Sequence, residues 1–254
     1  MSLSIEVLAS PAEYQARAPQ GYAGQACVVF DVLRATSVMV TGLANGAAGF
    51  LPVAEISEAL AWHQKEPTLL LAGEREGLRI TAAQSGSVEF DLGNSPREYT
   101  AARVHGRTIV TTTTNGTRAL RSCATAELVL AGAFLNLGAT VRWLVGQSFQ
   151  SVVLVCAGTG ESVAFEDVLC AGALCDQLTK AKRDCHLDDA ALLAWRAYRE
   201  AASDLVAVVS ASKNGRRLSA NPELRDDVAF CLRQDVFDLV GVRADDGAIR
   251  AVRI

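Results

Sequence analysis

The chain has 254 residues, of which 50% are hydrophobic and 20% are charged, so it can bury a large core and intrinsic disorder is excluded. Its formal net charge is −4, and its 24 basic residues form no polybasic run, which argues against nucleic acid and anionic membranes as partners. The 7 cysteines include no C-x-x-C pair and mostly lie in apolar stretches, which predicts buried free thiols in a reducing cytoplasm.

Taken in chain order, short apolar runs alternate with helical patterns. The runs that predict strands are 4–8, 25–30, 49–53, 68–72, 108–112, 127–131, 151–156, 237–242 and 249–254. Helices are expected over 35–44, 118–124 and 165–181, and residues 188–232 are helical in pattern without a clear strand. Near-continuous apolar strands between helices are typical of a sheet covered on both faces.

We therefore predict one α/β domain over residues 1–254, a three-layer α/β/α sandwich with a central, mostly buried sheet. The helical stretch at 188–232 either caps one end of the sheet or forms a small subdomain. No linker rich in Pro, Gly or Ser marks a domain boundary.

The segment 35–54 carries no charge and is long enough to span a bilayer. Thr41, Asn45 and Pro52 interrupt it, so a helix, a turn and a strand are the better interpretation. Residues 1–10 contain Glu6 and lack the basic and then apolar pattern of a signal peptide. We expect a cytoplasmic protein without a membrane span.

Polar residues collect where four expected strands end. These stretches are 31–36, 73–75, 111–117 and 158–161, the last continuing to Glu166 and Asp167, and a fifth polar stretch lies in a loop at 90–96. Ligands of open α/β sheets bind beyond the carboxyl ends of the strands. Carboxylates, guanidinium groups, hydroxyls and free amides at one such place suit a divalent metal beside an anionic substrate.

Each stretch also has a purely structural interpretation. Asp31 suits a helix cap, with Arg34 as its ion-pair partner, and Glu74 with Arg75 suits a solvated loop. Glu166 and Asp167 in the first turn of a helix would complement its dipole.

The stretch from Thr111 to Thr117 predicts a strand, a glycine loop and a helix N-terminus, which together present amides to a phosphate. It lacks the Lys of a P-loop, so an ATP-type site is disfavoured. A zinc site made by Cys170, Cys175, Cys185 and His186 matches no common spacing. Leu33 stands where haloacid-dehalogenase-type phosphatases need a second Asp, which excludes that match.

The segment from Val29 to Ser37, VFDVLRATS, resembles the leading motif of the 2-phosphosulfolactate phosphatase family. Further segments resemble its other motifs in the same order: 73–75 (GER), 90–96 (FDLGNSP), 112–117 (TTTNGT), 156–158 (CAG) and 166–167 (ED). The resemblance implies an Mg²⁺-dependent phosphatase with a layered α/β/α fold. The reaction it implies converts 2-phosphosulfolactate to 3-sulfolactate and phosphate, on the route to coenzyme M.

The residues and the resemblance together predict a site. Its catalytic residues are Asp31, Arg34, Glu74 and Arg75. Its substrate-binding and phosphate-binding residues are Asn94, Ser95, Thr113, Thr114, Asn115 and Gly116. Its Mg²⁺ ligands are Asp31, Glu74, and Glu166 or Asp167. Attack on phosphorus comes from water or from Asp31 itself, and the sequence leaves both open.

The alternative function is a non-catalytic binding module for a small dianionic metabolite. Converging carboxylates would repel such an anion unless a metal lies between them, which favours the enzyme. A nucleotide-binding or sugar-binding enzyme is disfavoured because no G-x-G-x-x-G follows the first buried strand. The high hydrophobic content leaves room for a homodimer interface.

Overall fold

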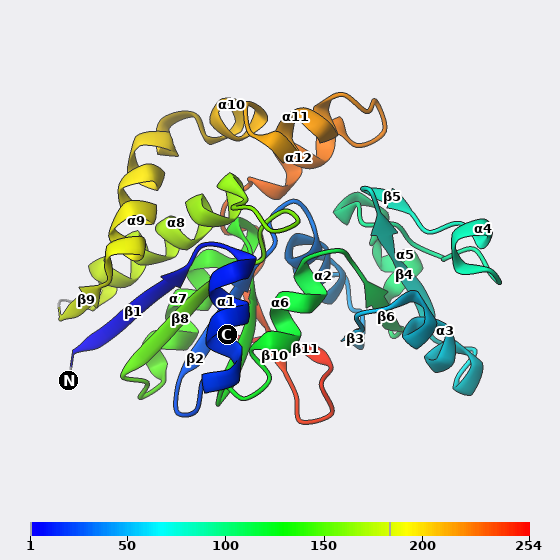
Figure 1. The fold of residues 1–254 in the computed structure, drawn as a ribbon, viewed down its shortest axis with the longest axis horizontal. Helices are drawn as coiled ribbons and strands as arrows, with labels where there is room; N and C mark the ends of the chain where they lie inside the picture. The colour runs from blue at the N-terminus through cyan, green and yellow to red at the C-terminus, as the bar shows by residue number, and fades with distance from the viewer. Residues whose placement is uncertain (1, 183) are drawn as a thin grey trace.

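The structure is a computed structural model that describes residues 2–182 and 184–254, and within them 11 strands form one sheet with helices on both faces (Figure 1). The strands are β1 (Leu3–Leu8), β2 (Ala26–Phe30), β3 (Gly49–Pro52), β4 (Leu70–Arg75), β5 (Leu78–Arg79), β6 (Thr108–Thr112), β7 (Leu128–Gly132), β8 (Ser151–Cys156), β9 (Cys185–Leu187), β10 (Leu239–Arg243) and β11 (Ile249–Arg253). The helices are α1 (Pro11–Arg17), α2 (Ala35–Ala44), α3 (Ile56–Lys65), α4 (Ala82–Ser85), α5 (Ala101–Val104), α6 (Gly116–Ser122), α7 (Leu137–Gly146), α8 (Phe165–Ala181), α9 (Asp189–Ala201), α10 (Leu205–Ser210), α11 (Lys213–Ser219) and α12 (Arg225–Cys231). The predicted α/β sandwich is confirmed.

The sheet consists of two parallel sets of strands with an antiparallel hairpin between them. Its order is β5-β4-β6-β3-β11-β10-β7-β2-β8-β1-β9. Strands β7, β2, β8, β1 and β9 are parallel, as are β3, β6 and β4. The hairpin β10–β11 joins the sets, and β11 meets β3 through the single pair Ile249–Phe50. The residues that follow β2, β6 and β8, at the carboxyl ends of strands from both parallel sets, line a cleft.

Strand β2 shows why the buried strands read as continuous apolar runs. Ala26, Val28 and Phe30 face the hydrophobic cluster beneath α7, α8 and α9, whereas Cys27 and Val29 face the cluster that includes α2 and α6. Because successive side chains of a strand point to opposite faces, a strand with helices on both faces has no position for a polar residue.

The first half of the uncharged segment 35–54 forms helix α2. All residues from Ala35 to Leu43 are buried, so this helix lies inside the fold. In the part of the chain that the structure describes, no helix has both the length and the hydropathy needed to cross a bilayer.

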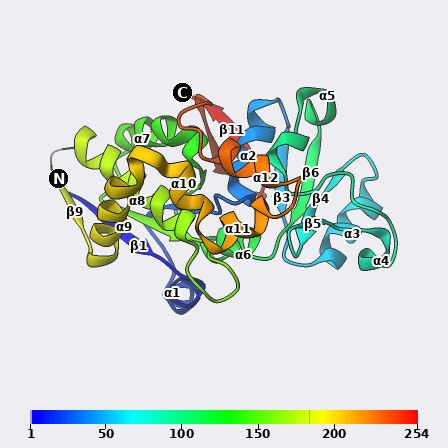
Figure 2. The ribbon, with the colours of Figure 1, turned by 90° about the horizontal axis from the view of Figure 1, so that it is seen from above.

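The predicted helical stretch at 188–232 is confirmed as α9 to α12, of which α9 packs beside α8 and α10 to α12 run over the top of the molecule (Figures 1 and 2). Asp188 and Asp204 accept hydrogen bonds from the amides of Ala191 and Ala207 and so cap α9 and α10. The last two helices, α11 and α12, lie near the carboxyl ends of β2, β4 and β8, where the cleft opens.

Several boundaries differ from the predicted ones. The residues from Gly73 to Arg75 belong to β4, because β5 pairs with Glu74 and Arg75 and extends the ladder. Helix α6 begins at Gly116, before its expected start. The sequence patterns do not predict α1, α7 or the short edge strand β9.

The cysteines are free thiols, as predicted, and all are buried except the half-buried Cys185. Among residues 2–182 and 184–254, no three His, Cys, Asp or Glu side chains are close enough to hold one ion. The zinc alternative at Cys170, Cys175, Cys185 and His186 therefore finds no support.

The contact between α8 and α9 generates a stability prediction. A Cβ atom on Gly172 would stand 2.0 Å from the carbonyl oxygen of Ala194, so the two helices pack closely only because this residue has no side chain. We expect Gly172→Ala to lower the free energy of unfolding by about 2–4 kcal/mol, measured by urea denaturation.

The matched control is Gly146→Ala in α7, where a Cβ would meet nothing within 4 Å. This substitution should leave the free energy of unfolding unchanged or raise it slightly, because Ala is the better helix former. Equal stability of both variants would contradict the proposed close packing.

Candidate active site

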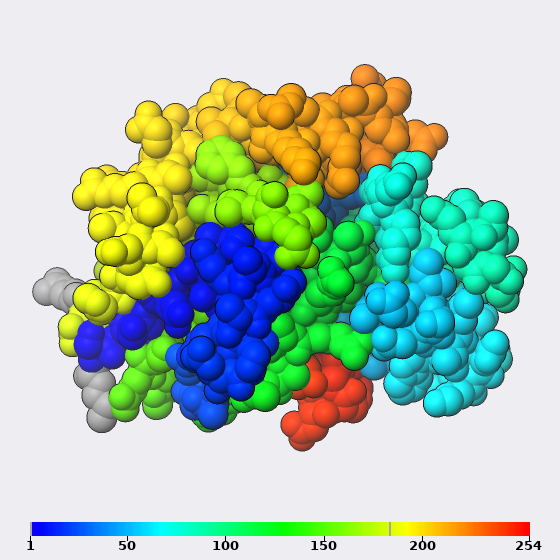
Figure 3. All heavy atoms as spheres, viewed as in Figure 1, coloured from blue at the N-terminus to red at the C-terminus, as the bar shows by residue number. Residues whose placement is uncertain are grey.

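A cleft of about 220 Å³ opens at the carboxyl ends of the buried strands. Figure 3 shows the hollow below the orange helices, between the green and cyan parts of the chain. The residues that line it come from segments far apart in the sequence: Asp31, Leu33, Arg34, Glu74, Glu76, Gly77, Asn94, Thr114, Asn115, Thr159, Gly160 and Arg217.

Asp31 lies at the floor of the cleft, directly after β2, and its side chain is only 8% exposed. Its Oδ1 accepts a hydrogen bond of 3.0 Å from the amide of Ala35 at the start of α2. The backbone amide of Arg34 also favours the charged form of this carboxylate by hydrogen bonding. A Cβ on Gly116 would stand 2.7 Å from Oδ2, so glycine is required there for the loop to approach the carboxylate.

The environment of Asp31 favours its protonated form. Burial raises the pKa of its carboxyl to about 6, the charges of Glu74 and Glu166 add to the effect, and the Ala35 amide opposes it. Three acidic side chains predicted to share the site thus interact electrostatically.

Glu74, at the end of β4, also faces the cleft. Its Oε1 accepts hydrogen bonds of 2.9 Å from both the amide and the hydroxyl of Thr114, and its Oε2 accepts one of 2.7 Å from the amide of Gly77. The carboxylate therefore connects the turn after β4 with the loop after β6.

Glu166 and Asp167, in the first turn of α8, are buried beside the floor and do not line the cleft. Asp167 accepts hydrogen bonds from the amides of Val32 (2.8 Å) and Gly158 (3.1 Å) and so connects the ends of β2 and β8. Burial, and then the charges of Asp31 and Glu166, raise the pKa of Asp167 well above its usual range.

The carboxylate of Glu166 binds the segment that begins α11. It accepts hydrogen bonds from Ser212 Oγ (3.1 Å) and from Asn214 Nδ2 (2.6 Å). Asn214 Nδ2 also lies 2.6 Å from Thr159 Oγ1, on the wall of the cleft.

Arg34 lines the cleft but is 2% exposed and already has partners. Its Nη1 donates to Asp227 Oδ2 (2.7 Å), and its Nη2 donates to the carbonyl oxygen of Gly77 (2.6 Å). The other oxygen of Asp227 accepts hydrogen bonds of 2.7 Å from Ser95 Oγ and Arg97 Nε. Asp227, a buried acid on α12, thus binds Arg34, Ser95 and Arg97 at once.

Besides Glu166 and Asp167, four predicted residues lie outside the cleft lining: Arg75, Ser95, Thr113 and Gly116. Arg75 donates to the carbonyl oxygen of Glu74 and to Thr112 Oγ1. The hydroxyl of Thr113 accepts a hydrogen bond of 3.3 Å from the amide of Thr117, so it caps α6. Asn94, in contrast, lines the cleft.

The loop before α6 retains free donors. The backbone amides of Asn115 and Gly116 donate to no described residue, while the side chain of Asn115 accepts a hydrogen bond of 3.2 Å from the amide of Gly160. Free amides at such a loop are available to the oxygens of a phosphate.

The residues fit a hard divalent cation held by two carboxylates. Asp31 and Glu74 both line the cleft, and carboxylate oxygens are the ligands that a hard cation prefers. No three acidic groups of the described chain converge on one point, but Mg²⁺ commonly takes one or two carboxylates together with waters and substrate phosphate oxygens.

Sequence reasoning missed two residues of this region, Asp227 and Arg217. Each has a like-charged neighbour, Asp226 and Arg216, on a short helix, and such pairs usually lie on a solvated face. The cap signal at Ser212 marks the start of α11 but says nothing about the cleft.

Comparison with known proteins agrees with the motif order. The profile of the family described as 2-phosphosulpholactate phosphatase matches residues 12–246. A protein of Caldanaerobacter subterraneus subsp. tengcongensis named probable 2-phosphosulfolactate phosphatase is 42% identical over 217 residues, covering 84% of this chain and 85% of the relative. Relatives with the same name from Caldicellulosiruptor saccharolyticus (37% identical) and Thermotoga maritima (39%) each cover 84% of this chain and are themselves covered to 86%.

The buried acid on α12 generates a second prediction. Asp227→Ala would leave the guanidinium of Arg34 buried without its counter-charge, so we expect the free energy of unfolding to fall by about 3–5 kcal/mol in urea denaturation. The matched control is Asp226→Ala on the neighbouring residue, whose side chain is 67% exposed. Its loss should change stability by less than about 0.5 kcal/mol, and equal effects would contradict the special role of Asp227.

The raised pKa of Asp31 generates a third prediction. Because folding raises this pKa from 3.8 to about 6, the folded protein binds the proton more tightly. The stabilisation from protonated Asp31 is thus full below pH 4 and is lost as the pH rises to 6. In EDTA, we expect Asp31→Asn to be more stable than the wild type by about 1–3 kcal/mol at pH 7.5 and equally stable at pH 4, measured by urea denaturation.

Asp246→Asn is the control with the opposite sign. Its exposed carboxyl has a pKa lowered to about 2 by hydrogen bonding to Arg250, so the substitution should not stabilise the protein at pH 7.5. A wild type that is as stable as Asp31→Asn at pH 7.5 would show that Asp31 is not destabilised by its burial.

Proposed function

Because the chain belongs to the 2-phosphosulfolactate phosphatase family, we propose that it hydrolyses 2-phosphosulfolactate, or a closely related phosphorylated hydroxy acid, to the hydroxy acid and phosphate. With the named substrate the product is 3-sulfolactate. The observation that carries the proposal is the placement of Asp31 and Glu74 in one cleft that Asn115 also lines, with the free amides of Asn115 and Gly116 on the loop that packs against Asp31.

We propose that Asp31 and Glu74 hold Mg²⁺, with Glu166 and Asp167 behind them. The ion, when bound, would neutralise phosphoryl oxygens and lower the pKa of a water molecule. The oxygen-only donor set supports a hard cation. The buried negative charge supports it as well, because burial and like charges both raise the pKa of Asp31 and a cation would reverse that shift.

The chain's own residues would position the substrate. The amides of Asn115 and Gly116 would donate to the phosphoryl oxygens, and Asn94 would donate to the substrate from the opposite wall. Arg34 would line the floor with its charge balanced by Asp227. Thr114, fixed by Glu74, would keep the loop in place.

The attacking oxygen is either that of a water molecule or Oδ2 of Asp31. The carboxylate route forms an aspartyl phosphate and expels the substrate alkoxide, and water then cleaves the acyl phosphate. Rapid quenching during turnover, followed by mass spectrometry of the peptide containing Asp31, distinguishes the two routes.

The binding-module alternative is weaker in this geometry. A site for a small dianion needs the amides but has no use for two carboxylates on the same cleft. The predicted homodimer and cytoplasmic location stay predictions.

The function generates a fourth prediction, tested by phosphate release from 2-phosphosulfolactate. We expect activity with Mg²⁺ that is abolished by EDTA and restored by added Mg²⁺. Asp31→Asn and Glu74→Gln should each lower kcat/KM by about 10²–10³-fold, because each removes a proposed ligand of the ion that would stabilise charge on the transferred group.

The matched control is Glu161→Gln, an exposed acid on the loop after β8 that does not line the cleft. Its kcat/KM should equal that of the wild type. Metal-dependent activity that survives Asp31→Asn would contradict the assignment of Asp31, and tight binding of the substrate without turnover would favour the binding module.

A further inference from the structure

The cleft has a cationic side chain with no partner, and it comes from the helical stretch above the sheet. Arg34 and Arg217 are the arginines that line the cleft. Two nitrogens of Arg34 are engaged, one of them by the carboxylate of Asp227. Arg217 is exposed and makes no hydrogen bond or ion pair with any described residue.

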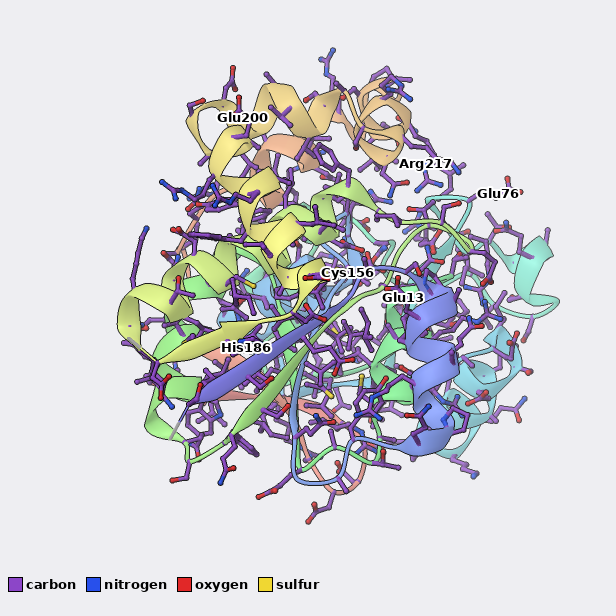
Figure 4. The ribbon with its side chains drawn as sticks, turned by 60° about the vertical axis from the view of Figure 1, so that its left-hand side comes forward. Glu13, Glu76, Cys156, His186, Glu200 and Arg217 are labelled. Carbon is purple, nitrogen blue, oxygen red and sulfur yellow. The ribbon has the colours of Figure 1, made fainter. Side chains whose placement is uncertain are left out.

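Arg217 faces the opposite wall of the cleft. Its Cζ lies 3.9 Å from the place that a Cβ on Gly77 would occupy, so α11 reaches across to the turn between β4 and β5. In Figure 4, Arg217 and Glu76, which also lines the cleft, lie near each other at one side of the molecule. The guanidinium thus lies over the Gly77 turn, whose amide donates to Glu74 and whose carbonyl oxygen accepts from Arg34.

The backbone that carries Arg217 is fixed although its guanidinium is free. Ser212 and Asn214 anchor the start of α11 to Glu166. A Cβ on Gly215 would stand 1.9 Å from the carbonyl oxygen of Val209, so α11 packs closely against the end of α10. Because this backbone is already fixed, only the rotamers of the Arg217 side chain lose freedom when the guanidinium binds a ligand.

We propose that Arg217 determines specificity by binding the acidic group of the substrate, carboxylate or sulfonate, that does not react. This inference rests on the proposed function, because it takes the phosphoryl group to lie at the floor. The planar fork of a guanidinium matches the paired oxygens of a carboxylate or sulfonate. Arg34 and Arg75, which the sequence suggests for this task, already donate to protein groups.

The test compares substrates that differ only in their acidic groups. They are 2-phosphosulfolactate, phospholactate and isopropyl phosphate, and the last is a secondary phosphomonoester without an acid. For Arg217→Gln we expect kcat/KM to fall by about 10–100-fold on 2-phosphosulfolactate, mainly through a higher KM, and to stay unchanged on isopropyl phosphate. An equal fall on phospholactate shows that Arg217 binds the carboxylate, and an unchanged value on phospholactate shows that it binds the sulfonate. Arg217→Lys should lose less, because it keeps the charge without the fork.

Arg216→Gln is the matched control, since it removes the same charge from the same helix at a residue that does not line the cleft. It should match the wild type on all three substrates. Glu76→Gln tests whether Arg217 serves instead to close the cleft by pairing with Glu76. The proposal predicts that this variant keeps or gains activity on the acids, and a loss equal to that of Arg217→Gln would overturn it.

Failure of the proposed role of Arg217 can be distinguished from failure of the proposed function. If the wild type cleaves the substrates and Arg217→Gln loses activity equally on all three, the proposed function stands and the specificity role is overturned. If the wild type cleaves none of them, calorimetric binding of 2-phosphosulfolactate still tests Arg217. Weaker binding by Arg217→Gln than by the wild type supports the role of Arg217. Equal binding by the two proteins, or no binding by the wild type, overturns it.

Discussion

The burial of negative charge at one junction is the constraint on which the rest of the structure depends. Within the described residues, five acidic side chains around the cleft are buried and one basic side chain is buried with them: Asp31, Glu74, Glu166, Asp167, Asp227 and Arg34. Burying a carboxylate without compensation is costly, so each must receive hydrogen bonds or an ion pair, or bind a proton. The donors that meet this need come from loops and helices far apart in the sequence, and their positions define the cleft.

The same acids therefore serve the fold and the site. Asp167 connects the ends of β2 and β8, and Glu74 connects the turn after β4 to the loop after β6. Glu166 binds Asn214 at the start of α11, and Asp227, which lies on α12, binds Arg34. The two parallel sets of strands share the apolar core that α2 and α6 cover, and these hydrogen bonds add polar links between the loops that line the cleft.

The sequence predicts the buried strands well for a physical reason. β6 and β8 have the predicted bounds because a strand covered on both faces is a continuous apolar run that begins and ends at polar residues. The same logic places Asp31 and Asn115 at strand ends. It cannot distinguish Arg75, whose side chain turns to Thr112, from Glu74 beside it, since both are polar residues at the same strand end. Their directions depend on the pairing of β4 with β5, which the sequence does not predict.

The charged pairs of the helical stretch show the limit of sequence reasoning most clearly. Asp226 and Asp227 are chemically identical neighbours, yet one side chain is 67% exposed and the other 0%. Adjacent residues on a helix point about 100° apart, so the packing of the helix on the cleft decides which carboxylate is buried. Arg216 and Arg217 are both exposed, yet only Arg217 lines the cleft. A guanidinium such as that of Arg34, already bound to a buried acid, would have to break that contact to grip a ligand. The guanidinium of Arg217, which no described residue binds, has no such contact to break. It therefore suits the proposed recognition of the substrate, whereas Arg34 balances buried negative charge.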